Sequence, residues 1–432
     1  MYLLEILILV ISFVILLGIG VPIAFSIGIS AMLTMLISIP AIPSFTTVAQ
    51  RMATGLDSFA LLAIPFFILA GQLMNRGGIA AKLIDFAKVL VGRLPGGLAY
   101  VNIIASMLFG AISGSAVAAA SAIGGIMNPR MVKEGYSRPF SAAINITAAT
   151  TGMIIPPSNI LIVYSLASGG VSIAALFVAG YIPGIIVGLS LMLVAGVIAY
   201  REGYSVGESV SFKEAILKFL DAIPSLILLF VVIGGIIAGV FTATEASAVA
   251  VLYTLILSMV FYRKVSIKDL PDILLQTVNT TSIVMILIGT SVGMSWVMSY
   301  ENLPQGVSNA LLSISDNPII VLLLINLILL FVGIFMDMTP AVLIFTPIFL
   351  PVVTELGMDP THFGIVMVLN LCIGLCTPPV GSVLFVGCSV AKIGIDKVIR
   401  PLLPLFVAMV VALILVTYIP ELSLWLPSVF GL

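Results

Sequence analysis

Charge is scarce in this sequence. Only 8% of its 432 residues are Asp, Glu, Lys or Arg, whereas 61% are hydrophobic. An ordinary soluble domain has about 25% charged and about 45–50% apolar residues, so this composition excludes that class. The net charge of −1 also argues against a nucleic-acid partner, which would require a basic surface.

Histidine, cysteine and nucleotide-binding motifs are almost or wholly missing. His362 is the only histidine, and the three cysteines, Cys372, Cys376 and Cys388, share one apolar segment without a nearby acidic or imidazole partner. We interpret them as small packing residues rather than as a transition-metal site. The sequence has no GxxxxGK[ST] motif, so nothing in it supports direct ATP drive.

Long apolar runs dominate instead. Many reach the ~20 residues that cross a bilayer as a helix, and the first, MYLLEILILV, lacks the basic start of a cleaved signal and is predicted to be a first span. We expect an all-α polytopic membrane protein with about ten spans. They lie near residues 4–20, 22–39, 57–75, 139–168, 171–200, 220–240, 242–262, 275–298, 360–391 and 401–420.

Basic residues predict which loops are cytoplasmic. Apart from Arg51, every Lys and Arg lies in one of five stretches, which the positive-inside rule places in the cytoplasm. Residues 269–391 contain no Lys or Arg, so their loops are expected to face outward, as are both termini. The acids of these loops are Glu301, Asp316, Glu355 and Asp359.

Two further apolar stretches, 98–131 and 318–355, begin and end on the same predicted side, so we expect re-entrant helical hairpins. The chain also repeats itself: GMIIPPSNILIVYSLAS (152–168) aligns with GLCTPPVGSVLFVGCSV (374–390), and GAISGSAVA (110–118) with GIFMDMTPA (333–341). Equivalent loops of the halves carry opposite predicted sidedness. The repeat is therefore expected to be inverted, as in many secondary transporters.

The repeated prolines indicate two broken helices. Pro156 and Pro157 would each cost a continuous helix about 3 kcal/mol, and freed backbone is tolerated at membrane depth only where it is buried or lines a cavity. Carbonyl oxygens at the breaks suit Na⁺, and N–H groups suit a carboxylate. The alternative is that the prolines merely kink the helices. Nearby side-chain oxygens belong to Ser113, Ser115, Asn159, Thr339 and Thr377.

Three charged residues near the spans have more than one interpretation. Asp337 is the only acid inside the second hairpin; an intramembrane carboxylate suggests a functional site, although a helix cap would also explain it. For Glu245 we expect capping of the helix that follows. Arg130 is interpreted as an orientation charge rather than as a ligand.

Five motifs together resemble the large membrane subunit of tripartite ATP-independent periplasmic (TRAP) transporters: SGSAV, GMIIPPS, GVFTATEASAVA, GIFMD and TPPVG. The resemblance implies Na⁺-driven uptake of an organic acid across the bacterial inner membrane by an elevator motion. It also implies two partners, an extracytoplasmic substrate-binding protein and a small four-span membrane subunit. Many relatives have an acid at Ala119 and a proline at Ala243, so roles attached to those positions do not carry over.

By motif position, the resemblance places sodium ligands at Ser113, Ser115, Gly152 and Pro156 in the first half and at Gly333, Gly374 and Thr377 in the second. With the side-chain oxygens above, Asn159 and Thr339 join this set. We assign substrate binding or coupling to Asp337, Ser158 and Gly381.

The expected organisation alternates scaffold and transport parts. Residues 1–97 and 201–317 form scaffold helices with an arm, and residues 98–200 and 318–432 each form a transport part with one hairpin and one broken helix. No enzymatic activity is expected. A stand-alone sodium:carboxylate symporter is the runner-up. An intramembrane serine hydrolase using Ser115 and His362 is a remote alternative, because His362, like Thr361, is expected in the outer loop at the start of the span near 360–391. The sequence does not separate a sialic or other sugar acid from a C4-dicarboxylate.

Overall fold

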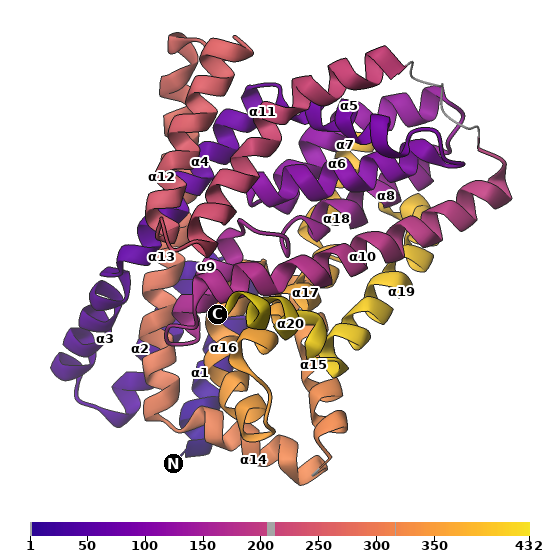
Figure 1. Ribbon diagram of the computed structural model, residues 1–432. Helices are drawn as coiled ribbons and strands as arrows, with labels where there is room; N and C mark the ends of the chain where they lie inside the picture. The colour runs from indigo at the N-terminus through magenta and orange to yellow at the C-terminus, as the bar shows by residue number, and fades with distance from the viewer. Residues whose placement is uncertain (1, 205–211, 316) are drawn as a thin grey trace.

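The computed structural model describes residues 2–204, 212–315 and 317–432, and within these ranges it is all helical, without a strand (Figure 1). Asp316, predicted to lie in an outer loop, falls outside the described residues. Eight described segments are long and apolar enough to cross a membrane. The chain is thus an all-helical, multi-pass membrane protein, as its composition predicted.

The first half begins with four helices and a short 3₁₀ turn, η1. A shorter helix, α5, then leads to the predicted hairpin. In chain order they are α1 (Tyr2–Gly18), α2 (Ile23–Ser38), α3 (Ala41–Leu56), η1 (Phe59–Leu62), α4 (Ala63–Arg76) and α5 (Ile79–Val91). The rest of this half comprises α6 (Gly97–Ser113), α7 (Ala116–Lys133), α8 (Arg138–Thr151), α9 (Asn159–Ala167) and α10 (Ile173–Glu202).

The second half is similar, with α14 in the place of α5, although three helices rather than four precede α14 and a further helix, α20, follows at the end. It begins with α11 (Phe212–Ile237), α12 (Ala243–Ile256), η2 (Leu257–Phe261), η3 (Ile267–Asp269), α13 (Leu270–Tyr300) and α14 (Leu303–Ile314). It continues with α15 (Pro318–Phe335), α16 (Met338–Glu355), α17 (Pro360–Leu375), α18 (Ser382–Ala391), α19 (Ile395–Tyr418) and α20 (Glu421–Phe430).

Both predicted helix breaks are present. Helix α8 ends at Thr151, and the seven residues before α9 include the two consecutive prolines, which supply no backbone donor. Helix α17 ends at Leu375 and α18 resumes at Ser382 after the second Pro–Pro pair. Both interruptions therefore lie where the sequence predicts them.

Both predicted hairpins are helix pairs with two-residue tips. Gly114 and Ser115 separate α6 from α7, whereas Met336 and Asp337 separate α15 from α16. Arms α15 and α16 each have 18 residues, enough by length and composition to cross a membrane. Helix length does not by itself distinguish such arms from spans, so re-entry stays a prediction.

One expected placement is wrong. His362 was predicted to lie in an outer loop, together with Thr361, but both are in the first turn of α17, and His362 is 1% exposed. The helix begins early because Pro360 occupies its first position and the Asp359 side chain accepts hydrogen bonds from the N–H groups of Thr361 and His362.

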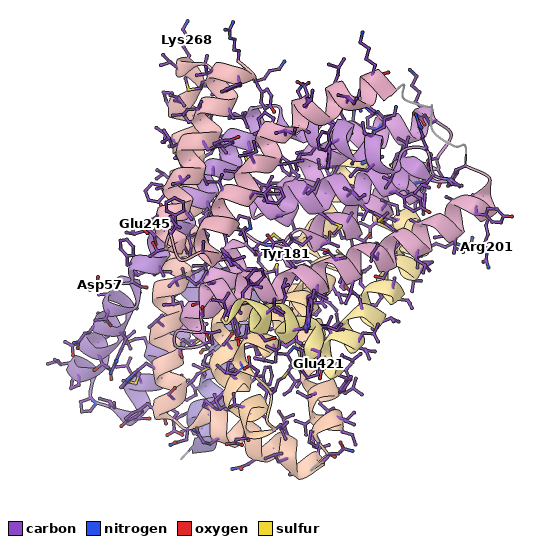
Figure 2. All side chains as sticks on the ribbon, in the orientation of Figure 1. Asp57, Tyr181, Arg201, Glu245, Lys268 and Glu421 are labelled. Atoms are coloured by element: carbon purple, nitrogen blue, oxygen red, sulfur yellow. The ribbon has the colours of Figure 1, made fainter. Side chains whose placement is uncertain are left out.

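The predicted cap of α12 is confirmed. Thr242 and Glu245 form a reciprocal capping box: the Glu245 carboxylate accepts from the Thr242 N–H at 2.8 Å, and the Thr242 hydroxyl accepts from the Glu245 N–H at 3.2 Å. Figure 2 shows Glu245 at the start of this helix, well below Lys268 at the upper end of the molecule. Glu245 therefore has a structural role.

The two halves interlock through their hairpins. Arm α7 of the first hairpin packs on half-helix α18, and arm α16 of the second packs on half-helix α9. A separate group forms around α13, on which α2, α3 and α4 pack, while α12 packs on α4 and α11. The hairpins and breaks thus form one packed group, bordered by α4 and α13 of the other.

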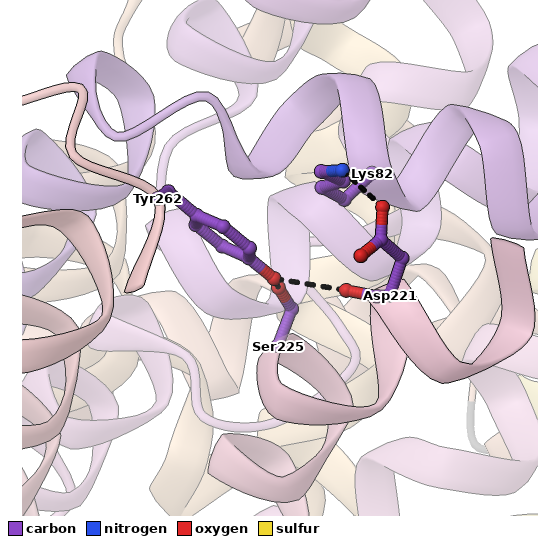
Figure 3. A network of polar contacts seen from close by, with 4 residues as sticks. All are labelled: Lys82, Asp221, Ser225 and Tyr262. Carbon is purple, nitrogen blue, oxygen red and sulfur yellow. Dashed lines mark hydrogen bonds and ion pairs between the residues drawn. The ribbon is translucent and has the colours of Figure 1, made fainter. Parts of the chain in front are cut away.

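Helices α5 and α14 occupy equivalent positions in the sequence repeat but opposite ends of the molecule, α5 in the upper part and α14 at the lower edge (Figure 1). A polar network fixes α5 to α11. Lys82 forms an ion pair with Asp221, and the Tyr262 hydroxyl donates to the Asp221 carbonyl at 3.0 Å and contacts the Ser225 hydroxyl at 3.1 Å (Figure 3). Helix α14 has no charged residue.

Candidate functional site

A cavity of about 450 Å³ lies where the two hairpin tips meet α4 and α13. Both hairpins contribute their tips, and the first helix break contributes the start of α9. The opposite wall comes from α4 and α13. Its polar lining residues are Gln72, Asn75, Ser113, Ser115, Ser121, Asn159, Thr280, Asp337 and Thr339. Segments far apart in the sequence therefore converge on one space.

The first hairpin tip is held against the first break. Gly114 has a left-handed backbone (φ 61°), and a Cβ added there would lie 2.8 Å from the Asn159 side-chain nitrogen, so glycine is needed for both conformation and space. The Asn159 Oδ1 atom is buried and lacks a hydrogen-bond partner among the described residues. A buried amide oxygen beside the cavity is available as a ligand.

Serine side chains complete this tip. The Ser115 hydroxyl accepts from the Ala118 N–H at 3.2 Å and so caps α7. The Ser113 hydroxyl donates to the Ser115 carbonyl at 3.4 Å. Both hydroxyl oxygens retain a lone pair that could face a cation.

The break itself packs on the hairpin through glycine. A Cβ built on Gly152 would lie 2.5 Å from the Cα atom of Gly110, so the two backbones touch. Ser158 is fully buried, and its hydroxyl donates to the Met153 carbonyl at 2.5 Å. That bond holds the loop between α8 and α9 in place.

The second hairpin repeats the glycine contact with different side chains. A Cβ built on Gly374 would lie 2.6 Å from the Cα atom of Gly333. Asp337 occupies the N-cap position of α16, yet its side chain makes no capping hydrogen bond. Asp337 lines the cavity, as expected of a residue with a functional role.

The Thr377 hydroxyl lies at the second break. It donates to the Ile373 carbonyl at 2.7 Å, which leaves its oxygen lone pairs free to accept a cation. Thr377 does not line the cavity, and among the residues of this break and its flanks only Leu375 does. We call the expected ion site of each half a half-site. The two half-sites are therefore not equally open to the cavity in this structure.

The structure brings together only part of the predicted set. Five predicted residues line the cavity: Ser113, Ser115, Asn159, Asp337 and Thr339. The others lie in the packed breaks or behind the tips and do not line the cavity: Gly152, Pro156, Ser158, Gly333, Gly374, Thr377 and Gly381.

Four polar residues of the lining were missed. Gln72 and Asn75 on α4, Ser121 on α7 and Thr280 on α13 all face the cavity. The amides of Gln72 and Asn75 were visible in the sequence near the end of an apolar run. Because polar side chains are costly in a membrane span, they were a usable signal of a functional wall.

The electrostatics of the cavity suit cations and hydrogen-bond donors. Asp337 carries the one formal charge among the described residues that line it, and no Lys, Arg or His is in that set. An anionic substrate there would need compensating positive charge, which bound cations or helix N-termini can supply.

A hydrolytic mechanism finds no support in this geometry. The Ser115 hydroxyl is engaged as a helix cap, and His362 is buried on α17, where its Nε2 atom contacts the Thr417 carbonyl at 3.2 Å. His362 does not line the cavity that contains Ser115. A nucleophile requires a base within hydrogen-bond reach, so these residues do not form such a pair.

Comparisons with known proteins identify the family of this chain. The family described as "Tripartite ATP-independent periplasmic transporter, DctM component" matches residues 10–422. The sialic acid TRAP transporter large permease protein SiaM of Vibrio cholerae is 39% identical over 95% of this chain and 96% of its own length. The C4-dicarboxylate TRAP transporter large permease protein DctM of Rhodobacter capsulatus is 37% identical over 96% of both chains.

A solved structure supports the fold. The YdaH transporter of Alcanivorax borkumensis superposes with a TM-score of 0.63 over 89% of this chain and 88% of its own, although the two sequences are only 12% identical. Such a likeness bears on architecture alone.

Proposed function

The chain belongs to the DctM component family of tripartite ATP-independent periplasmic transporters, and on that basis we propose that it is the large permease subunit of a sodium-coupled organic-acid uptake system. Its relatives are permeases rather than enzymes. The observation that carries the proposal is the cavity at which both hairpin tips meet the first helix break.

Sodium coupling is inferred from the donor set. The first half-site offers the Asn159 Oδ1 atom, which lacks a partner, and the hydroxyls of Ser113 and Ser115. The second offers the Thr377 hydroxyl and the backbone at the point where Gly333 contacts Gly374. Neutral oxygens suit a hard monovalent cation, so we assign one sodium ion to each half.

The substrate class is a small organic anion. The relatives are named for sialic acid and for C4-dicarboxylates, and both kinds of molecule carry carboxylates. Because no basic side chain lines the cavity among the described residues, the carboxylate would be held by helix N–H groups, hydroxyls and the amides of Gln72 and Asn75. Asp337 would couple the ions to this substrate.

The proposed assembly has three components. A small four-span membrane subunit would brace the scaffold formed by residues 1–97 and 201–317, and an extracytoplasmic binding protein would deliver the substrate. Residues 98–200 and 318–432 would move together as an elevator in the bacterial inner membrane, with both chain termini periplasmic. The interlocking of α7 with α18 and of α16 with α9 supports a common motion of these two parts.

Uptake by proteoliposomes tests the proposal. The chain is reconstituted with its small subunit and binding protein, and radiolabelled sialic acid and a C4-dicarboxylate are supplied separately. We expect uptake of one of them only with an inward sodium gradient, rising cooperatively with sodium concentration because two ions bind. Uptake that ignores sodium would refute the coupling.

The runner-up is distinguished in the same system. A stand-alone sodium:carboxylate symporter would transport its substrate at full rate from this chain alone. Omitting the binding protein and the small subunit in turn therefore decides between the two architectures, and we expect either omission to abolish uptake.

A further inference from the structure

The wall of the cavity opposite the hairpin tips carries two amide side chains. Gln72 and Asn75 both line the cavity, and they lie three residues apart on α4, so they share one face of the helix. Asn75 is about 4.5 Å further along the helix axis. A Cβ built on Gly71 would lie 2.8 Å from the Ser113 carbonyl oxygen. Helix α4 therefore touches the first hairpin tip directly beside Gln72.

The two amides have hydrogen-bonding capacity to spare. Gln72 is half-buried and Asn75 is exposed to the cavity, and neither side chain forms a hydrogen bond with another described residue. A side-chain amide has two N–H donors and a carbonyl oxygen that accepts. The N–H groups can serve the substrate carboxylate, as proposed above. The two carbonyl oxygens then still need donors, and the substrate has to supply them.

A second carboxylate on the substrate would not meet this need. An ionised carboxylate only accepts hydrogen bonds, and the cavity already contains the acceptor-only carboxylate of Asp337. A dicarboxylate would place a further acceptor among the amide carbonyl oxygens and Asp337. A hydroxyl group donates as well as accepts, so hydroxyl groups would pair with these oxygens.

The charge balance leads to the same class of substrate. With one sodium ion in each half-site and Asp337 ionised, the site carries one net positive charge, which a single substrate carboxylate neutralises. A dicarboxylate would leave one negative charge without compensation, which is costly away from water. Apolar side chains make up much of the remaining lining: Ile64, Ile68, Ile160, Val163, Val284 and Leu375.

We propose that the substrate is a polyhydroxylated monocarboxylic acid, that is, a sugar acid, and that Gln72 and Asn75 select it by accepting hydrogen bonds from its hydroxyl groups. The inference rests on the proposed function, because it uses the same cavity and the two sodium ions. A site built to pair with hydroxyl groups rejects an analogue that lacks them, since its own polar groups would stay unpaired. Gln72 and Asn75 are thus specificity-determining residues.

Thermal stabilisation by ligands tests the inference. The chain and its small subunit are placed in nanodiscs without the binding protein, so that the specificity of the binding protein does not decide the result. The sugar-acid probes are D-gluconate and sialic acid. Hexanoate matches gluconate in chain length and in its single carboxylate but has no hydroxyl group, and succinate has two carboxylates. In sodium, we expect at least one sugar acid to raise the unfolding temperature with increasing concentration, and hexanoate and succinate to have no effect.

Variants assign the selection to the α4 wall. Gln72→Leu and Asn75→Leu should each weaken binding of the sugar acid roughly fivefold, as expected for one neutral hydrogen bond, and should leave the stabilisation by sodium alone unchanged. Gln276→Leu is the matched control, because Gln276 is an exposed amide on α13 that does not line the cavity. Asn75→Lys adds a positive charge to the wall and should gain binding of succinate, a result that misfolding does not produce.

Three results would overturn the inference. One is succinate that stabilises the wild-type protein as strongly as the sugar acids do, which would leave the proposed function intact. Another is sugar-acid binding that is unchanged in both leucine variants. The third is the absence of stabilisation by every probe in sodium. The proposed function fails separately, in the uptake assay that includes the binding protein, if uptake there does not depend on sodium.

Discussion

At the first hairpin, a Cβ on Gly152 would lie 2.5 Å from the Cα atom of Gly110, and at the second, a Cβ on Gly374 would lie 2.6 Å from that of Gly333. These glycines occupy matching positions of the two repeats. Both contacts join a hairpin arm to the end of the helix that precedes a Pro–Pro break. The halves therefore share the same backbone contact.

The side chains on this shared backbone differ. The N-cap of the second hairpin arm is Ser115 in the first half and Asp337 in the second. Asn159 of the first break aligns with Gly381 of the second. The partnerless amide oxygen is found only in the first half-site, and the carboxylate only in the second. The backbone contact is therefore common to both halves, whereas the polar side chains beside it differ between them.

The largest expected effect tests the shared backbone. Gly152→Ala and Gly374→Ala should each destabilise the protein by about 3 kcal/mol or more and abolish uptake, because the new methyl group would meet backbone that cannot rotate away. Thermal unfolding and uptake assays measure both. Gly125→Ala is the control, since a Cβ there has open space. Equal behaviour of all three variants would show that the contact is not tight.

The next effect tests the chemistry of the second half-site. Asp337→Asn keeps the shape and removes the charge, so uptake should fall by roughly ten- to hundredfold, as expected for losing a charged interaction of about 1.5–3 kcal/mol. The protein should still fold and assemble. Asp359→Asn, at the N-cap of α17, should transport normally, because asparagine also caps well. Normal uptake by Asp337→Asn would leave that residue without a role in coupling.

A smaller effect is expected at the second break. Thr377→Val removes one neutral hydroxyl, worth about 1 kcal/mol, and should raise the half-saturating sodium concentration roughly fivefold while the backbone ligands preserve transport. Thr354→Val is matched, because its hydroxyl also donates to a carbonyl four residues earlier, Leu350, and is exposed. A sodium titration in which the two variants coincide would remove Thr377 from the site.

The smallest effect concerns the ion pair between α5 and α11. Lys82→Gln should reduce the free energy of unfolding by at most about 1 kcal/mol, since Lys82 and Asp221 form a largely exposed pair. Asp221 raises the pKa of Lys82, so the contribution is complete below the ordinary lysine pKa of about 10.4 and is lost only as pH rises past the raised value. Chemical unfolding at pH 7 and pH 9 should therefore give the same difference. A difference that disappears by pH 9 would contradict the assignment.

The sequence was sufficient for the two breaks and for the helix pair on either side of each hairpin tip, whereas the site residues stay predictions. Pro156 and Pro157 interrupt an apolar run that would otherwise be continuous, and their copy in the second half makes the pattern unambiguous. Because glycine, serine and threonine gather at the hairpin tips, the tips themselves were also visible. Five of the predicted side chains do line the cavity.

The missed elements are those that lack a uniform apolar signal. Helix α3 carries Gln50 and Arg51 among apolar residues, and α20 has only ten residues, so neither resembles a span. Gln72 and Thr280 belong to α4 and α13, and the contact of these helices with the hairpins depends on tertiary packing. No local sequence pattern predicts which face of a helix lines a cavity.

The sequence also does not predict how much each break contributes to the cavity. Sequence symmetry predicts equal breaks, yet only the first contributes a polar side chain to the cavity. The packing of the hairpin group against α4 and α13 decides which residues line the cavity in this structure. That is a property of the conformation rather than of the repeat.

Two-sided cysteine labelling tests the inversion on which the whole comparison depends. Lys133 and Glu355 are the last residues of equivalent helices, α7 and α16, and both are exposed. In a background lacking Cys372, Cys376 and Cys388, a cysteine replacing Lys133 should react with a membrane-impermeant maleimide only from the cytoplasm, and one replacing Glu355 only from outside. Labelling of both from the same side would contradict an inverted repeat.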